Sequence, residues 1–223
     1  AKVDLVILHL TKKQANRKAI QVYRLNEGLK LKHYDDIFYS RNHHLFSIWQ
    51  DDLKEEGWVL IDGREQNMMD KIQERTQVDL GTICSSHQGI ITGCDKAFVI
   101  EDADRCRFDD TLIAPWIKNK NVKKYEITPS GKYLLHTDGV EDLGEFPELE
   151  RHLSPFKDRL RQRRECKKGL RKWYMLQWGR KKAHFQCPKI VFPYKASSNR
   201  FAFDEEGLFF SADIYSLVLR EDY

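Results

Sequence analysis

Most apolar residues of this chain fall in short runs with the length and residue types of β-strands. Residues 3–10 are almost uniformly apolar, which predicts a strand buried on both faces, and residues 20–25 alternate, which predicts a second strand. Residues 89–100 have the pattern of a strand, a glycine-bounded turn and another strand. Strands are also predicted at residues 189–192, 201–203, 208–210 and 214–219.

Apolar residues at helical spacing occur in fewer places. Residues 45–53 predict a short helix, which a short strand over residues 58–61 would follow, and residues 67–74 predict another helix. Apolar positions between residues 149 and 160 are spaced four, three and four apart and predict a longer helix, with a start or kink at Ser154-Pro155. The elements together predict an α+β fold, mixed and strand-rich, with a few helices.

The composition excludes several classes of protein. Of 223 residues, 41% are hydrophobic and 12% aromatic, which is enough for a core and excludes a disordered chain, a collagen or a coiled coil. No apolar run approaches the roughly 20 residues that a bilayer requires, so no membrane partner is expected. The five cysteines are odd in number and widely spaced, which favours a reducing cytoplasm over a disulfide framework.

The charge distribution is strongly uneven, although the net charge is only +4. Residues 151–195 contain 15 Lys and Arg against two acidic residues, a net charge of +13. Such a block typically binds a polyanion, although acidic residues from elsewhere in the chain could fold over it and neutralise it. Trp173, Tyr174 and Trp178 lie within the block, where they could stack on bases or pack in the core.

Phosphate contact is the role predicted for the basic block, because phosphate and sugar receive roughly half to two-thirds of protein–DNA hydrogen bonds. The predicted phosphate ligands in the block are Lys157, Arg161, Arg164, Lys168, Arg171, Lys172, Arg180, Lys181 and Lys182. A second basic segment at residues 118–125 adds Lys118 and Lys120, and its asparagines are interpreted as turn residues.

Two loops are candidates for reading bases. One is the turn Thr92-Gly93, and the other is the polar loop 195–200, where Lys195 and Arg200 are long hydrogen-bond donors between two predicted strands. A flexible surface loop is the alternative for residues 195–200. Gly89 and Gly93 are interpreted as structural residues that allow a tight turn with positive φ.

Sequence motifs of catalysis are missing from the chain. It has no Cys-x-x-Cys, no Gly-x-Ser-x-Gly and no Gly-x-Gly-x-x-Gly, and His184 with Cys187 supplies too few ligands for zinc. No catalytic residue and no metal site are therefore predicted. The alternatives to DNA binding are a protein-interaction module, an RNA-binding domain and a Mg²⁺-dependent nuclease that would use Asp158, Glu165 and Lys167.

Several blocks of the sequence resemble, in this order, the specificity domains of the TaqI-like family. The first is Gly89-Ile90-Ile91-Thr92-Gly93, followed by Asp95-Lys96-Ala97-Phe98-Val99-Ile100. The later blocks lie at residues 112–125, 132–135, 146–149, 152–153, 160–163, 173–176, 188–193 and 201–204. The resemblance covers about residues 46–219, and the order of the blocks is its most specific feature.

The resemblance implies that residues 46–223 form a DNA target-recognition domain, truncated at its C-terminus. In the family this domain follows an adenine-specific DNA methyltransferase domain of type II or type IIG restriction-modification enzymes. Residues 1–45 would then be a linker and the last strand or hairpin of that α/β domain. The implied partners are double-stranded DNA and the methyltransferase domain of the same polypeptide, in the cytoplasm of a bacterium or archaeon.

The resemblance also implies a division of labour. The methyltransferase domain of the family binds S-adenosylmethionine, flips an adenine out of the duplex and methylates its N6. The Asn-Pro-Pro-aromatic motif and the cofactor glycine loop of that domain do not occur in this chain. The chain is therefore expected to hold no cofactor and to be non-catalytic by itself, and the resemblance leaves open whether the longer enzyme also cleaves DNA.

Overall fold

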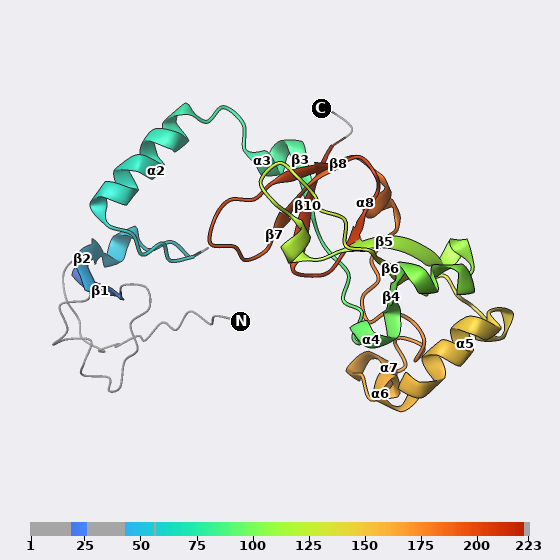
Figure 1. Cartoon of the computed structure of the whole chain (residues 1–223). Coiled ribbons are helices and arrows are strands. Elements are labelled where there is room, and N and C mark those ends of the chain that lie inside the picture. Colours follow the sequence, from blue (N-terminus) through green and yellow to red (C-terminus); the bar gives the residue numbers. More distant parts are fainter. Residues whose placement is uncertain (1–18, 26–42, 56, 221–223) are drawn as a thin grey trace. The chain divides into compact units, whose positions relative to one another are not determined.

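The computed structural model describes residues 19–25, 43–55 and 57–220 (Figure 1). The chain divides into two compact units, Ala1–Gln77 and Val78–Tyr223. The strand predicted over residues 3–10 lies outside the described residues. The division after Gln77 does not coincide with the expected boundary after residue 45, and the methyltransferase origin of residues 1–45 stays a prediction.

The described residues of the first unit form a two-stranded antiparallel sheet and one α-helix. Strand β1 (Ala19–Leu25) confirms the predicted strand, and β2 (His43–Trp49) pairs with it. The helix predicted over residues 45–53 is wrong, because pairing with β1 outweighs the helical spacing and leaves only the 3-10 turn η1 (Gln50–Asp52). The strand predicted over residues 58–61 is also wrong, since these residues have no regular structure.

Helix α2 (Gly63–Arg75) confirms and extends the helix predicted over residues 67–74. It begins earlier because Asp62 forms a capping box with Glu65, which satisfies the first free N–H groups. The Arg24 guanidinium ties β1 to this helix, since Nη1 lies 2.7 Å from Glu65 Oε1 and Nη2 donates to the Leu60 carbonyl at 2.8 Å.

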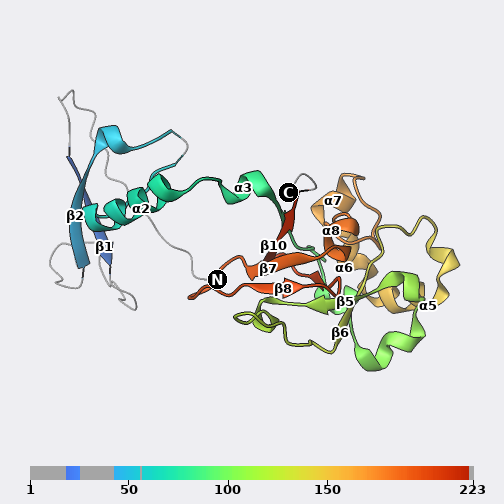
Figure 2. The same cartoon turned by 90° about the horizontal axis from the view of Figure 1, so that it is seen from above.

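The second unit contains two four-stranded sheets (Figure 2). The first sheet has, in spatial order, β3 (Cys84–Gln88), β10 (Ile214–Leu219), β7 (Lys189–Pro193) and β8 (Ala202–Asp204), all antiparallel. The second sheet has β4 (Val99–Glu101), β6 (Lys132–Leu135), β5 (Ile113–Ile117) and β9 (Phe209–Phe210), of which β5 and β9 pair in parallel. The four strands predicted from residue 189 onward are therefore confirmed, and the fold is α+β and strand-rich, as predicted.

The helices of the second unit are short. They are α3 (Leu80–Ile83), α4 (Asp95–Phe98), α5 (Pro147–Leu153), α6 (Lys157–Arg161), α7 (Arg164–Lys167) and α8 (Ala183–Gln186). The 3-10 turns of this unit are η2 (Asp102–Arg107), η3 (Asp110–Leu112), η4 (Asn119–Asn121), η5 (Leu143–Glu145) and η6 (Ser154–Phe156). The second strand predicted within residues 89–100 is confirmed only at its end. Helix α4 occupies residues 95–98, and β4 begins at Val99.

The helix predicted beyond residue 149 is a series of short helices rather than one. The turn η6 interrupts it at Ser154-Pro155, where a kink was expected, and Arg163 adopts extended backbone before α7. The predicted apolar face is nevertheless correct, since Leu149, Leu153 and Leu160 are buried in the core.

The core lies between the two sheets and these helices. Its largest buried side chains include Trp116, Phe98, Phe185, Phe210 and Leu134. The basic block contributes to the same core, because Tyr174 is buried and the Trp173 ring packs edge-on against it. Packing is therefore the main role of these two aromatic residues in the free chain.

The two glycines of the turn are structural for different reasons. Gly93 has φ +76°, the left-handed conformation expected for it, and a Cβ there would lie 2.8 Å from Cδ of Arg163. Gly89 lacks the expected positive φ. Gly89 is needed for close approach instead, since a Cβ there would lie 2.2 Å from the Ser211 carbonyl oxygen.

Candidate nucleic-acid interface

The first candidate surface is the basic helical segment, which we define as residues 157–168. Arg161 and Lys168 are exposed, and neither is paired with a described carboxylate. The Arg164 side chain is 78% exposed, with Nε 3.8 Å from Glu165 Oε1. The Lys157 ammonium lies 5.1 Å from the centre of the Trp173 ring. Three of the four predicted phosphate ligands in this segment thus keep their charge in solvent.

Two further cations of this segment, Arg159 and Lys167, are also exposed but were not among the predicted phosphate ligands. Arg159 borders a surface cavity of about 540 Å³ that the turn Thr92-Gly93, Lys96 and Lys118 also line. The signal for Arg159 was present, because it lies between Lys157 and Arg161 in the same basic run.

The predicted ligands from residue 171 onward are more engaged within the protein. Arg171 Nη1 lies 2.7 Å from Asp138 Oδ2, and Lys172 Nζ donates to the Glu141 carbonyl at 2.6 Å. Arg180 Nη2 donates to Gln88 Oε1 at 2.8 Å. The backbone of Arg180 has φ +63°. Lys181 is exposed and has no described partner.

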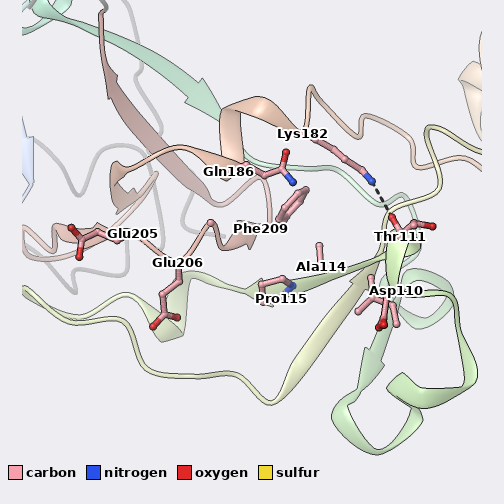
Figure 3. A pocket seen from close by; sticks show the side chains of 11 residues that line it. Asp110, Thr111, Ala114, Pro115, Lys182, Gln186, Glu205, Glu206 and Phe209 are labelled. Atoms are coloured by element: carbon pink, nitrogen blue, oxygen red, sulfur yellow. Dashed lines mark hydrogen bonds between the residues drawn. The ribbon is translucent and has the colours of Figure 1, made fainter.

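Lys182 lies at a surface cavity of about 590 Å³ (Figure 3). Its Nζ donates to the Thr111 carbonyl at 3.1 Å. Asp110, Glu205 and Glu206 line the same cavity, so its walls carry three carboxylates against this one ammonium. This charge balance is unfavourable for a phosphate.

The structure brings the second basic segment and the polar loop together. Arg200 Nη1 donates to the Val122 carbonyl at 3.0 Å, and its Nη2 donates to Asn119 Oδ1 at 2.8 Å. Asn119 Nδ2 in turn donates to the Lys195 carbonyl at 3.2 Å. We name residues 118–127 and 194–201 the paired loops. In Figure 2 the yellow-green segment that follows β5 lies beside the orange loop between β7 and β8.

The paired loops present a group of free cations. Lys120, Lys123, Lys124 and Lys195 are exposed, and none is paired with a described carboxylate. Lys118 differs, because its ammonium forms an ion pair with Asp95. Partial burial opposes ionisation of Asp95, but hydrogen bonds from Lys118 and Thr92 outweigh it and lower the pKa of the carboxyl.

Arg200 has a structural role that sequence analysis missed. It was expected to read bases, yet its guanidinium is occupied by Asn119 and Val122 of the other loop. Asn119 was interpreted as a turn residue, and it lies in η4 and also joins the two loops. Contacts between residues about 80 positions apart in sequence leave no local signal.

Arg163 is a second structural cation that sequence analysis did not identify. Its Nη2 donates to the carbonyls of Trp173 and Met175 at 2.7 and 2.8 Å, and its Nη1 donates to the Thr92 carbonyl at 3.2 Å. The planar guanidinium thus connects the basic helical segment, the chain after it and the glycine turn. The turn Thr92-Gly93 is consequently held by internal contacts on one side.

The two carboxylates of the alternative nuclease set differ, since Asp158 is exposed whereas Glu165 is engaged within the protein. Glu165 is buried, and its Oε2 accepts a hydrogen bond from Gln177 Nε2 at 3.1 Å. Among the described residues no group of three or more His, Cys, Asp and Glu side chains could hold a metal ion. None of the described helices is long and apolar enough to cross a membrane.

Comparison with known proteins places the chain beside type II methyltransferases. No protein-family model matches it. It is 22% identical over 184 residues to the type II methyltransferase M.BanIII of Aneurinibacillus aneurinilyticus, covering 77% of this chain and 32% of the relative. It is 24% identical over 164 residues to the type II methyltransferase M.PaeR7I of Pseudomonas aeruginosa, covering 72% and 28%. The chain therefore spans about a third or less of the length of these relatives.

Among solved structures, the chain aligns with the type IIL restriction-modification enzyme MmeI in complex with DNA. The alignment has a TM-score of 0.45 and 13% identity, and it covers 92% of this chain and 25% of that one.

Proposed function

We propose that this chain is the double-stranded DNA recognition region of a type II methyltransferase of a restriction-modification system. The similarity to M.BanIII and M.PaeR7I supports the methyltransferase context. The observation that carries DNA recognition is the joining of the paired loops by Arg200 and Asn119. Two separate basic segments of the sequence thereby become one rigid surface with four free lysines.

The two candidate surfaces suit different tasks. Exposed Arg and Lys on short helices neutralise phosphates, so the basic helical segment would grip the duplex and define its register. Loops at the end of a sheet can enter a groove, so the paired loops would carry the residues that reach base edges. Of the predicted base readers Lys195 and Arg200, Lys195 remains free for this task, and Lys120, predicted to contact phosphate, is also exposed on the paired loops.

The longer protein would transfer a methyl group to the N6 of adenine. S-adenosylmethionine would bind to its methyltransferase domain in the cytoplasm of the host, and this chain would hold the duplex while the target base is flipped. Extruding a base from the stack costs a few kcal/mol, so the flanking duplex must be held firmly. Whether the longer protein also cleaves DNA would depend on residues outside this chain.

Binding to a labelled duplex over a salt series tests the proposal. The variant Arg161→Glu/Lys168→Glu reverses two free charges of the basic helical segment and disturbs no described ion pair. We expect wild-type affinity to fall steeply with salt, and we expect the variant to bind more weakly with a shallower slope. Each lost phosphate contact should reduce the log–log slope by about 0.9.

Lys71→Glu/Arg75→Glu is the matched control, because both residues are exposed on α2 in the first unit and the double substitution changes the charge by the same amount. It should leave the slope close to that of the wild type. Preference for RNA over duplex in competition would contradict the proposal, and so would cleavage of plasmid DNA on addition of Mg²⁺ by this chain. A complete absence of duplex binding at low salt would instead favour a protein-interaction module that docks on the catalytic domain.

A further inference from the structure

The tip of the first paired loop has an unusual residue in an unusual conformation. Lys123 N donates to the Glu126 carbonyl at 2.8 Å, and Val122 bridges Ile127, so Lys124 and Tyr125 form the centre of a tight turn. Tyr125 has φ +68°, in the left-handed region where glycine or asparagine normally occurs. A bulky aromatic residue at this position is strained.

The side chain of this strained tyrosine lies in solvent. Tyr125 is 81% exposed, the highest exposure among the large hydrophobic residues of the described chain. Its backbone N–H donates to the Phe201 carbonyl at 2.8 Å, which attaches the turn to the second paired loop. A strained and exposed residue that other parts of the fold hold in position points to a function outside the folding of the chain itself.

The charges around the ring indicate what it contacts. The Lys124 ammonium lies 5.2 Å from the ring centre, and Lys120, Lys123 and Lys195 are exposed on the same paired loops. Glu126 is the exposed acidic residue of the turn. An aromatic ring surrounded by lysines suits a ligand that has both phosphates and flat, stackable groups, and nucleic acid has both.

We infer that Tyr125 inserts into the DNA duplex and stacks on a base at the position where the paired loops meet it. This inference rests on the proposed function and adds to it the residue that enters the base stack. The neighbouring lysines would neutralise the phosphates on both sides of the inserted ring. Apolar and aromatic wedges of this kind unstack a base step, and they bind more readily where the step is already weakened.

Tyr125→Asn separates this role from folding. Asparagine tolerates the left-handed conformation, so the variant relieves strain and should melt no lower than the wild type. Tyr125→Phe keeps the ring and loses only the hydroxyl. Trp58→Asn is the matched control, because Trp58 is a 52% exposed aromatic residue without regular structure in the first unit, outside the paired loops.

The experiment measures the binding of these four proteins, and of a double lysine variant, to an intact duplex and to the same duplex with one central abasic site. The wild type, Tyr125→Phe and Trp58→Asn should prefer the abasic duplex, because its gap receives the ring with little unstacking. Tyr125→Asn should lose this preference and bind the abasic duplex roughly five- to a hundredfold more weakly than the wild type. A Lys123→Gln/Lys124→Gln variant should bind both duplexes more weakly by the same factor.

Each other result has a definite meaning. If the wild type binds duplex with a steep salt dependence and Tyr125→Asn behaves identically, the stacking role is wrong and DNA recognition stands. If the wild type binds neither duplex, the proposed function and the stacking role both fail. Tighter binding to single-stranded RNA or DNA than to either duplex would replace insertion into the duplex by capture of an unpaired base.

Discussion

The buried ion pair between Lys189 and Asp204 should hold the second paired loop in place. The two residues pair across the base of the β7–β8 hairpin, whose connecting loop is residues 194–201. Both side chains are fully buried. The Lys189 ammonium also donates to the Phe185 carbonyl, and the Asp204 carboxylate accepts the backbone N–H groups of Glu206 and Leu208, both at 3.0 Å. The hairpin therefore has a satisfied charge pair at its base, the end opposite the connecting loop.

Removing one partner leaves the other charge buried without compensation. Lys189→Met keeps most of the side-chain volume but leaves the Asp204 carboxylate buried without a counter-ion. This should lower the free energy of unfolding by about 3–5 kcal/mol. For a unit of this size the melting temperature should fall by roughly 6–20 °C. Urea unfolding followed by tryptophan fluorescence measures the change, and an unchanged m-value would show that the unfolding reaction is the same.

The double variant tests the cause. Lys189→Met/Asp204→Asn removes both charges and keeps an acceptor for one of the two backbone N–H groups, so it should be more stable than Lys189→Met alone. The reasoning is refuted if Lys189→Met costs less than about 1 kcal/mol, or if the two substitutions destabilise additively. The loss should extend to function, because a loosened hairpin no longer holds Lys195 and Arg200 in place, and duplex affinity should fall in Lys189→Met even below its melting temperature.

Three further predictions concern the turn, its anchor and a buried histidine. Gly93→Ala should destabilise the second unit by about 1–3 kcal/mol in urea unfolding, because φ +76° and the nearby Arg163 side chain both disfavour a Cβ. Gly131→Ala should cost less, because Gly131 has φ +67° but no atom lies within 4 Å of the added Cβ. Arg163→Ala should lower the free energy of unfolding by about 2–4 kcal/mol in thermal unfolding, and Arg163→Lys should lose most of the same amount. The reason is that an ammonium cannot reach the three carbonyls of Thr92, Trp173 and Met175 together. Equal stability of Arg163→Lys and the wild type would contradict this. Burial and then the charge of Lys182 lower the pKa of His136. The neutral imidazole therefore stabilises the fold fully above the ordinary histidine pKa, and this stabilisation is lost as the pH falls. The free energy of unfolding should decrease on acidification by at most about 1.4 kcal/mol per pH unit, and His136→Asn should flatten this pH dependence.

Local sequence patterns predicted the elements whose partners are close by or whose two faces differ clearly. The structure has all the strands predicted from Lys189 onward, and in β7 and β8 buried positions alternate with more exposed ones. Residues 67–74 of helix α2 were evident from their own spacing, whereas the start set by the capping box of Asp62 was not predicted. The segment of β2 was misjudged, because Leu45, Ile48 and Trp49 have helical spacing but form a strand once β1 supplies a partner.

The positions of the charges along the chain were evident from the sequence, but their availability was not. Whether a lysine or arginine meets solvent, a carbonyl or a carboxylate depends on residues far away in the chain. Arg171, Lys118 and Arg200 are all occupied by groups at least 20 residues away, whereas Arg161 and Lys120 are not. A basic block therefore predicts a charged region without saying which of its members can bind a phosphate.

The sequence by itself determined the strand-rich α+β character, the basic block and the glycine turn, because short-range periodicity and residue type encode these features. Only the tertiary structure decided that residues 118–127 and 194–201 form one surface, since hydrogen bonds across about 80 residues join them. It also decided that Tyr125 is exposed with a left-handed backbone, because its conformation depends on the carbonyl of Phe201. Residue type is local information, whereas the neighbours that engage or release a side chain are chosen by the fold.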